Sequence, residues 1–244
     1  MRALILASGR GSRLGDLTSN QPKCFTEVAG KRLIDWQRES LGKGGIQNIA
    51  ITTGYFSDSF NGLFQERFHN ADWADSNMVY SLMQASSLIA DEGAIVSYSD
   101  IIYSADAITR LSQSNDDIAI AYDPNWLEQW QARYDNPLDD AESFSMDQGY
   151  LTDIGRRVNS LSEINGQYMG LLKFTPAGWH IVSHYLDSLS EDARKRLDMT
   201  SLLQQLIQQD VKIGAVAITD EWVEVDTPQD LEVASLTVPD FSWT

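Results

Sequence analysis

A glycine-rich loop near the start of the chain carries the strongest chemical signal in the sequence. The loop consists of Leu6, Ala7, Ser8, Gly9, Arg10, Gly11 and Ser12. A glycine-rich loop that leaves a buried strand brings backbone N–H groups close to phosphate oxygens. Arg13 and Lys23 follow the loop, and Asp16 is the one acid among these cations. The segment is therefore predicted to bind a polyphosphate, with the Arg13 fork gripping two of its oxygens.

The overall charge makes this cluster of cations informative. The 244 residues include 35 Asp and Glu against 18 Lys and Arg, a formal net charge of −17 at pH 7. A field of this sign repels nucleic acids and anionic membranes, so we expect neither as a partner. A chain this acidic binds an anion by concentrating its few cations, and the first loop is such a place.

Cysteine usage and hydropathy exclude further classes of protein. The single cysteine, Cys24, excludes an intrachain disulfide framework and a cysteine-rich zinc site. No apolar run reaches the ~18 residues of a membrane span, and the run at 3–7 is too short for a secretory signal. His180 and His184 lie one helical turn apart but complete no zinc motif. Because the sequence shows neither a membrane span nor a secretory signal, we expect a cytoplasmic protein.

Two familiar phosphate-binding motifs do not fit the first loop. A P-loop needs Gly-Lys-Ser/Thr at the start of a helix, and no such tripeptide follows the glycines. A dinucleotide fingerprint reads G-x-G-x-x-G, and Gly15 stands one position too late to supply its third glycine. On these residues alone, a plain glycine turn with surface arginines remains the alternative.

The longer string around the loop resembles the signature of the nucleotidyltransferases. This family includes sugar-1-phosphate nucleotidylyltransferases and phosphocholine cytidylyltransferases, and its members usually read A-A-G-x-G-x-R-L followed by K-P-K. The chain reads L-A-S-G-R-G-S-R-L followed by Q-P-K, so Ser8 replaces the second Ala and Gln21 the first Lys. The resemblance implies a Rossmann-like doubly wound mixed sheet, a catalytic role for Arg13, and contact of Lys23 with the α-phosphate and the acceptor.

Alternating strand and helix patterns supply the elements that must position this loop. Apolar and β-branched runs predict buried strands at 3–7, 49–53, 94–98, 118–122 and 168–174, a hairpin at 150–154 and 157–161, and late strands at 211–218 and 222–225. Apolar spacing predicts helices at 33–41, 60–68, 77–89, 105–111, 179–189, 199–208 and 227–234. The alternation predicts an α/β fold, a doubly wound mixed sheet with a small insert. We expect a single domain, 1–244, with a nucleotide-binding half at 1–122 and an acceptor-binding half at 123–244.

Two carboxylates are predicted to meet at the loop. Asp100 follows the predicted strand 94–98, and Asp226 follows the predicted strand 222–225. Ligands of open α/β sheets lie beyond the carboxyl ends of the strands, so both acids should face the crevice of the glycine loop. Two carboxylates suffice to hold Mg²⁺, which completes its shell with water and substrate phosphates. Asp226 also matches the late D-T-P-x-D segment of the resembled family, while a helix cap or turn remains the alternative for each acid.

The resemblance implies that an acceptor phosphate attacks the α-phosphorus of a nucleoside triphosphate and expels pyrophosphate. Such a reaction needs charge neutralisation between two anions rather than a protein nucleophile. The segment 72–82 resembles the base-facing segment of phosphocholine-type cytidylyltransferases, and its Asn77 and Ser81 stand one turn apart. The Gln-Pro-x-Gly-x-x-x-Ala stretch of the sugar-specific enzymes is absent. CTP is therefore the expected nucleotide. The alternative for Asn77 is that it only caps its helix.

The acceptor is expected to lie against the irregular middle of the chain. Candidate residues there are Trp126, Trp130, Arg133, Tyr134, Asp135, Asp139, Asp140 and Glu142, and the resemblance adds Glu163 and Gln167. Aromatic rings with carboxylates cage an ammonium group by cation–π attraction, and an arginine reads a carboxylate. The spacing of Trp126, Trp130 and Arg133 equally fits one packed face of a short helix.

The leading hypothesis is a Mg²⁺-dependent cytidylyltransferase that transfers CMP from CTP to a small phosphorylated or phosphonate acceptor. Acceptors of the phosphocholine, phosphoethanolamine, aminoethylphosphonate and phosphorylated amino acid types are expected. A hexose-1-phosphate nucleotidylyltransferase and a nucleotide sensor without turnover are the alternatives, and the predicted metal carboxylates count against the sensor. The sequence leaves a homo-oligomer open.

Overall fold

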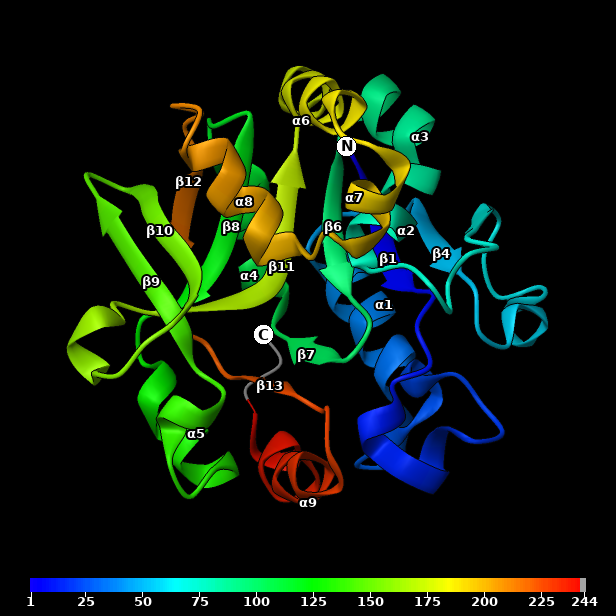
Figure 1. The fold of residues 1–244 in the computed structure, drawn as a ribbon. Helices are drawn as coiled ribbons and strands as arrows, with labels where there is room; N and C mark the ends of the chain where they lie inside the picture. Colours follow the sequence, from blue (N-terminus) through cyan, green and yellow to red (C-terminus); the bar gives the residue numbers. More distant parts are fainter. Residues whose placement is uncertain (242–244) are drawn as a thin grey trace.

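A nine-stranded mixed sheet forms the centre of the chain (Figure 1). The computed structural model describes residues 1–241. Along the sheet the strands follow the order β5–β4–β1–β6–β11–β8–β12–β10–β9. Their bounds are β1 (Arg2–Ala7), β4 (Ile49–Thr53), β5 (Arg67–His69), β6 (Ala94–Tyr98), β8 (Ile118–Asp123), β9 (Glu142–Asp147), β10 (Tyr150–Arg157), β11 (Gln167–Phe174) and β12 (Gly214–Ala217). The predicted α/β class with a mixed sheet is confirmed.

The strands nearest the glycine loop run parallel and are buried. β5, β4, β1 and β6 pair in parallel, with Leu4 of β1 opposite Ala50 of β4 and Val96 of β6. All three side chains are fully buried, as expected for strands that are covered on both faces. β11 lies antiparallel between β6 and β8, so the two halves of the sequence share one sheet. The carboxyl ends of β1 and β6 therefore lie side by side where the loop begins.

Helices pack around this sheet. Their bounds are α1 (Leu33–Lys43), α2 (Met78–Gln84), α3 (Ser86–Glu92), α4 (Ala105–Gln113), α5 (Trp126–Arg133), α6 (Pro176–Ser188), α7 (Glu191–Arg196), α8 (Met199–Ile207) and α9 (Pro228–Thr237). α1 packs beside α4, and α3 beside α6, the latter pair at the top of Figure 1. α9 begins with a capping box in which Thr227 and Asp230 satisfy each other's backbone N–H groups.

A smaller core ties the first loop to the last helix. Two short ribbons take part, β7 (Ile101–Tyr103) with β13 (Trp222–Glu224) and β2 (Glu27–Val28) with β3 (Lys31–Arg32). The buried members of this core are Leu14, Val28, Leu33, Ile102, Val223, Val225, Ala234 and Val238. In Figure 1, β13 lies between β7 and α9, below the main sheet. Packing of these apolar side chains brings the segment after β1 next to the segment after β13.

The helix predicted at 60–68 is wrong. The chain instead forms a 3₁₀ turn at Ser57–Phe60, a turn through Gly62 and the edge strand β5. Phe60 and Phe64 are buried, which explains the helix-like spacing. Gly62 has a φ of 76°, in the left-handed region, so the backbone cannot continue as a right-handed helix there.

The predicted hairpin has the wrong partner strand. β10 begins at Tyr150 as expected, but it pairs with β9, which precedes it in the chain. Gln148 and Gly149 form the turn between them with φ of 49° and 84°. Two central residues with positive φ match the twist of a tight two-residue hairpin, so the turn fixes this pairing.

Other expectations concern single elements and the chain as a whole. The helix predicted at 77–89 is two helices, α2 and α3, that meet at Ala85.

The last three residues of the predicted single domain lie outside the described residues, and its division at residue 122 stays a prediction. No helix among residues 1–241 combines the length and the apolar character needed to cross a membrane.

Candidate active site

A cavity of about 320 Å³ opens at the carboxyl ends of β1 and β6. The predicted site residues that line it are Leu6, Ser8, Gly9, Gly11, Ser12, Arg13, Lys23, Asn77, Ser81, Asp100 and Asp226. Five further lining residues were not among the predicted ones: Trp73, Ser76, Met78, Tyr98 and Ser99. The glycine loop, the start of α2 and both predicted metal carboxylates therefore share one cavity.

Lys23 lies between the charged groups of the cavity. Its Nζ donates hydrogen bonds to Asp100 Oδ2 at 2.6 Å and to Asp226 Oδ1 at 2.5 Å. Burial of the 7% exposed lysine acts to lower the pKa of its ammonium, but the two carboxylates outweigh burial and raise this pKa above its ordinary value. Arg13, whose side chain is largely exposed, pairs with Oδ2 of Asp226. The site therefore pairs two basic side chains with two buried or half-buried carboxylates.

The backbone at Gly11 and Pro22 determines where Lys23 lies. Gly11 has a φ of 66°, and a Cβ added there would lie 2.5 Å from Cδ of Lys23. The lysine stem therefore passes directly over the glycine, through space that any other residue would occupy. Pro22, with φ −59° and ψ 146°, leads the chain into the 3₁₀ turn Lys23–Phe25.

Replacing Gly11 with alanine should displace Lys23 and slow the reaction. The added Cβ overlaps three carbons of the Lys23 side chain, and the left-handed backbone adds strain of about 1–2 kcal/mol. We expect the rate to fall by at least about tenfold, because small misplacements of a catalytic group are costly. Gly30→Ala is the matched control, since Gly30 also has a positive φ, lies in the turn between β2 and β3 away from the cavity, and an added Cβ there meets nothing within 4 Å. Equal rate losses in single-turnover assays of both variants would argue against the contact with Lys23.

The β7–β13 ribbon brings the two carboxylates together. β6 ends at Tyr98, Asp100 lies in the turn that follows, and β7 then pairs antiparallel with β13. The N–H of Val225 donates to the carbonyl oxygen of Asp100 at 2.8 Å. The loops that carry Asp100 and Asp226 are thus bonded to each other, which places both side chains around Lys23.

Asp100 and Asp226 fit a magnesium ion by their donor chemistry. Oδ1 of Asp100 is buried without a hydrogen-bond partner, so one carboxylate oxygen keeps its lone pairs available. No group of three His, Cys, Asp or Glu side chains within residues 1–241 is arranged as a metal site. Mg²⁺ does not require one, because it keeps water and substrate phosphates in its shell. The two aspartates are accordingly the candidate ligands.

Asn77 and Ser81 line the cavity and also stabilise their own helix region. Oδ1 of Asn77 accepts a hydrogen bond from the N–H of Met78 at 2.8 Å, at the N-cap of α2. Oγ of Ser81 accepts a hydrogen bond from Nδ2 of Asn70 at 2.9 Å. Both bonds use an oxygen as acceptor, so they leave the Asn77 amide hydrogens and the Ser81 hydroxyl hydrogen to donate to a base.

Trp73 and Tyr98 add aromatic rings that local patterns did not single out. Trp73 packs against Tyr55 with ring centroids 5.1 Å apart, and a Cβ added at Gly54 would meet it at 2.4 Å. Tyr98 packs edge-on against Tyr168 with ring centroids 5.7 Å apart. Trp73 lies within the segment 72–82 quoted above, but its direction depends on the turn after β4, which is distant in sequence.

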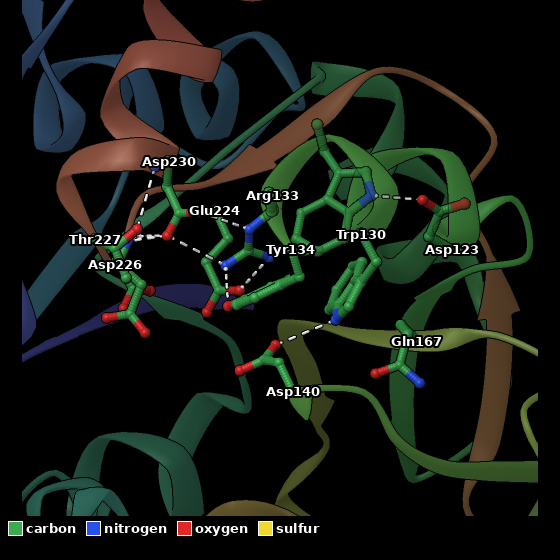
Figure 2. Close-up of polar contacts among 12 residues, drawn as sticks. Asp123, Trp130, Arg133, Tyr134, Asp140, Gln167, Glu224, Asp226, Thr227 and Asp230 are labelled. Atoms are coloured by element: carbon green, nitrogen blue, oxygen red, sulfur yellow. Dashed lines mark hydrogen bonds and ion pairs between the residues drawn. The ribbon is translucent and has the colours of Figure 1, made fainter. Parts of the chain in front are cut away.

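The predicted acceptor residues lie apart from this cavity. Trp126 and Trp130 are 4% and 3% exposed and pack edge-to-face, and Nε1 of Trp130 donates to Asp140 at 3.1 Å (Figure 2). Gln167 is buried as well, whereas Glu163 is exposed. The predicted site residues that do not line the cavity are Ala7, Arg10, Trp126, Trp130, Arg133, Glu163 and Gln167. The assignment of Ala7 and Arg10 to the nucleotide, and of the other five residues to the acceptor, stays a prediction.

Comparisons with known proteins bear on this geometry. The chain is 35% identical to the CTP:phosphoglutamine cytidylyltransferase of Campylobacter jejuni, over 96% of this chain and 98% of that protein. It is 38% identical to the choline-phosphate cytidylyltransferase of Streptococcus pneumoniae, over 39% of this chain and 43% of that protein. The solved structure of the inositol-1-phosphate CTP transferase from T. maritima matches with a TM-score of 0.76 at 20% identity, covering 97% of this chain and 94% of that one.

The family follows from the extent of these matches. The structural match shows the fold, and the Rossmann-like mixed sheet predicted from the sequence is confirmed. Residues 3–209 match the family model of the MobA-like NTP transferase domain. That match covers most of the chain, and the Campylobacter jejuni relative matches nearly end to end. The chain therefore belongs to the MobA-like NTP transferase family and is a nucleotidyltransferase.

Proposed function

We propose that this nucleotidyltransferase transfers CMP from CTP to the phosphate or phosphonate of a small acceptor that also carries an ammonium group. Pyrophosphate is released, and Mg²⁺ is the cofactor. The observation that carries the proposal is Lys23, buried between Asp100 and Asp226 beside a glycine-rich loop. The names of two relatives support the nucleotide and the acceptor class, since phosphoglutamine and choline phosphate both combine a phosphorylated group with an ammonium group.

The charges of the site suit a reaction between two anions. The acceptor oxygen bonds to the α-phosphorus, the bond to the β-phosphate oxygen breaks, and pyrophosphate leaves with that electron pair. The ammonium of Lys23 neutralises charge between the two phosphorus centres, and the Arg13 fork stabilises the leaving pyrophosphate. Asp100 and Asp226 would hold Mg²⁺, which would supply Lewis-acid polarisation of phosphoryl oxygens.

A protein nucleophile is not needed for this displacement. Cys24 directly follows Lys23, but its side chain is 1% exposed. Burial also raises the pKa of the Cys24 thiol far above its usual range, so the thiolate is not formed at neutral pH. Direct transfer between the two substrates is therefore the mechanism that the site supports.

Acidic groups next to Tyr98 support an acceptor with a positive charge. Burial raises the pKa of Tyr98, and the charges of nearby carboxylates, Asp198 and Glu224 among them, raise it further. Burial also raises the pKa of Glu224 to about 7, against the opposing charge of Arg133. Tyr98 lines the cavity, so an acceptor ammonium bound beside it would contact an aromatic ring and favour the ionised form of these carboxylates.

A pyrophosphate-release assay with a panel of substrates tests the proposed function. CTP, UTP, ATP and GTP are each combined with phosphocholine, phosphoethanolamine, aminoethylphosphonate, phosphorylated amino acids and glucose 1-phosphate. We expect release with CTP and an ammonium-bearing acceptor. The preference for CTP arises from hydrogen bonds to the base edge, so Asn77→Ala should reduce it.

Other outcomes of this assay identify the alternatives. Turnover with glucose 1-phosphate but not with the ammonium-bearing compounds would make the chain a sugar-phosphate nucleotidylyltransferase. Binding of CTP without pyrophosphate release in the presence of any acceptor would indicate a nucleotide sensor. Calorimetric titration that shows UTP or ATP binding as tightly as CTP would contradict the expected base preference.

A further inference from the structure

We infer that Arg133 and Asp230 are positioning residues that fix the backbone at Asp226, so that its carboxylate faces Asp100 and Lys23. Neither side chain touches the cavity. Both act instead through hydrogen bonds and ion pairs to the segment that carries Asp226. The inference rests on the proposed function only where it concerns metal-dependent turnover.

Arg133 pairs with two carboxylates, the buried Asp230 and the partly exposed Glu224. It is the last residue of α5, and its side chain is 2% exposed. Nε donates to Oδ1 of Asp230 at 2.8 Å, and Nη2 lies 3.4 Å from Oδ2, so the guanidinium fork spans both oxygens. Nη1 pairs with Oε2 of Glu224 at 2.9 Å. Figure 2 shows Asp230 and Glu224 beside Arg133, on the side toward Asp226.

Asp230, held by Arg133, in turn forms hydrogen bonds to the backbone at Asp226. Its Oδ2 accepts hydrogen bonds from the N–H of Thr227 at 2.8 Å and from the N–H of Asp226 at 3.0 Å. The bond to Thr227 belongs to the capping box of α9. The bond to Asp226 goes beyond what a helix cap requires, because Asp226 precedes the N-cap residue.

Burial of these charges argues for a role beyond packing. Removing Arg133 and Asp230 from water costs several kcal/mol per ion before their attraction is counted. Arg133 nevertheless lies among Trp130, Tyr134 and two acids rather than at the surface. Asp230 accepts hydrogen bonds from Nε of Arg133 and from two backbone N–H groups, and the charged donor makes its bond to Asp230 a strong one.

Arg133 forms ion pairs with residues on both sides of Asp226 in the sequence. Glu224 lies two residues before Asp226, and Asp230 is bonded to its backbone from the other side. Between them, Val225 donates to the carbonyl of Asp100. Asp100 and Asp226 share the ammonium of Lys23 and repel each other. They keep a fixed spacing only when the bonds around them hold their backbones in place.

Arg133→Met should weaken metal binding and chemistry while sparing substrate binding. We expect kcat to fall and the Mg²⁺ concentration for half-maximal rate to rise, each by about 10–100-fold, with the KM for acceptor within about twofold. Asp230→Asn, which keeps the shape of the side chain, should change the same quantities in the same direction. Arg133→Lys should recover part of the loss, since it restores charge without the fork.

Two readouts on the protein without substrates test the positioning itself. The backbone amides of Asp226 and Thr227 should exchange hydrogen faster by at least about tenfold in Arg133→Met and in Asp230→Asn. In the first variant the Asp230 side chain is no longer held in place, and in the second it is a weaker acceptor. Binding of Mn²⁺, followed by electron paramagnetic resonance, should weaken in parallel. Arg156→Met is the matched control, since Arg156 is exposed, pairs with Asp153 on β10 and should leave all readouts unchanged.

The outcomes separate this inference from the proposed function. If Arg133→Met raises only the KM for acceptor, with amide exchange and Mn²⁺ affinity as in the unchanged chain, Arg133 binds the acceptor and the inference is overturned. If the unchanged chain shows no turnover, the proposed function fails, while amide exchange and Mn²⁺ binding still decide the positioning role. Should Arg133→Met fail to fold, the same two readouts on Asp230→Asn and Arg133→Lys decide it.

Discussion

Replacing Lys23 with alanine is expected to lower the rate of nucleotidyl transfer by about 10²–10³-fold, the loss typical of one electrostatic contact in a closed site. Its ammonium lies within 2.6 Å of carboxylates on two separate loops, where substrate phosphates and metal are proposed to meet. Charge between the two phosphates grows in the transition state, so the rate should fall more than the affinity for CTP. Single-turnover rates and calorimetric CTP affinities measure the two effects separately.

Two further substitutions isolate the charge of Lys23. Lys23→Met keeps a stem to pack over Gly11 and removes only the ammonium, so its rate should be as low as that of Lys23→Ala. Lys23→Arg should rescue poorly, because a broad planar fork cannot replace a compact charge in a buried position. Near-normal chemistry in the alanine and methionine variants would remove Lys23 from the mechanism.

The part of the site that could be predicted from the sequence is local in its chemistry. Glycines and cations within residues 6–14 signal an anion site, and a short apolar run signals the strand before Asp100. The rule that ligands lie beyond the carboxyl ends of strands then connects Asp100 and Asp226 with the loop. All three line the same cavity.

Contacts between distant segments could not be predicted, because each partner has a sufficient local explanation. Arg133 fits a helix face and Asp230 fits a capping box, yet they are 97 residues apart and meet because α5 packs against α9. No periodicity encodes that packing. The pairing of β9 with β10 depends similarly on a positive φ at Gln148, which its residue type does not signal.

Replacing Asp226 with asparagine is expected to remove most of the activity, and the activity that remains should not depend on Mg²⁺. Asp226 supplies one carboxylate oxygen to Lys23 and the other to Arg13, and its side chain is 4% exposed. Loss of its charge withdraws an anionic ligand from the proposed metal and a counter-charge from both cations. Metal stabilisation of a phosphoryl transfer is worth several kcal/mol, so a rate loss of roughly 10³-fold follows.

Raising the Mg²⁺ concentration should not restore the rate of Asp226→Asn or of Asp100→Asn. Both acids lie in loops after strands rather than in the apolar core, so both variants should fold. Metal binding stabilises a folded protein by mass action, so adding Mg²⁺ to the protein with CTP should raise the Tm of the unchanged chain further and leave that of either variant as it is with CTP alone. Asp220→Asn is the matched control, because Asp220 precedes β13 on the same segment and accepts a hydrogen bond from Ser104 away from the cavity. A wild-type rate at limiting Mg²⁺ in either variant would show that the replaced acid caps or turns the chain and holds no metal.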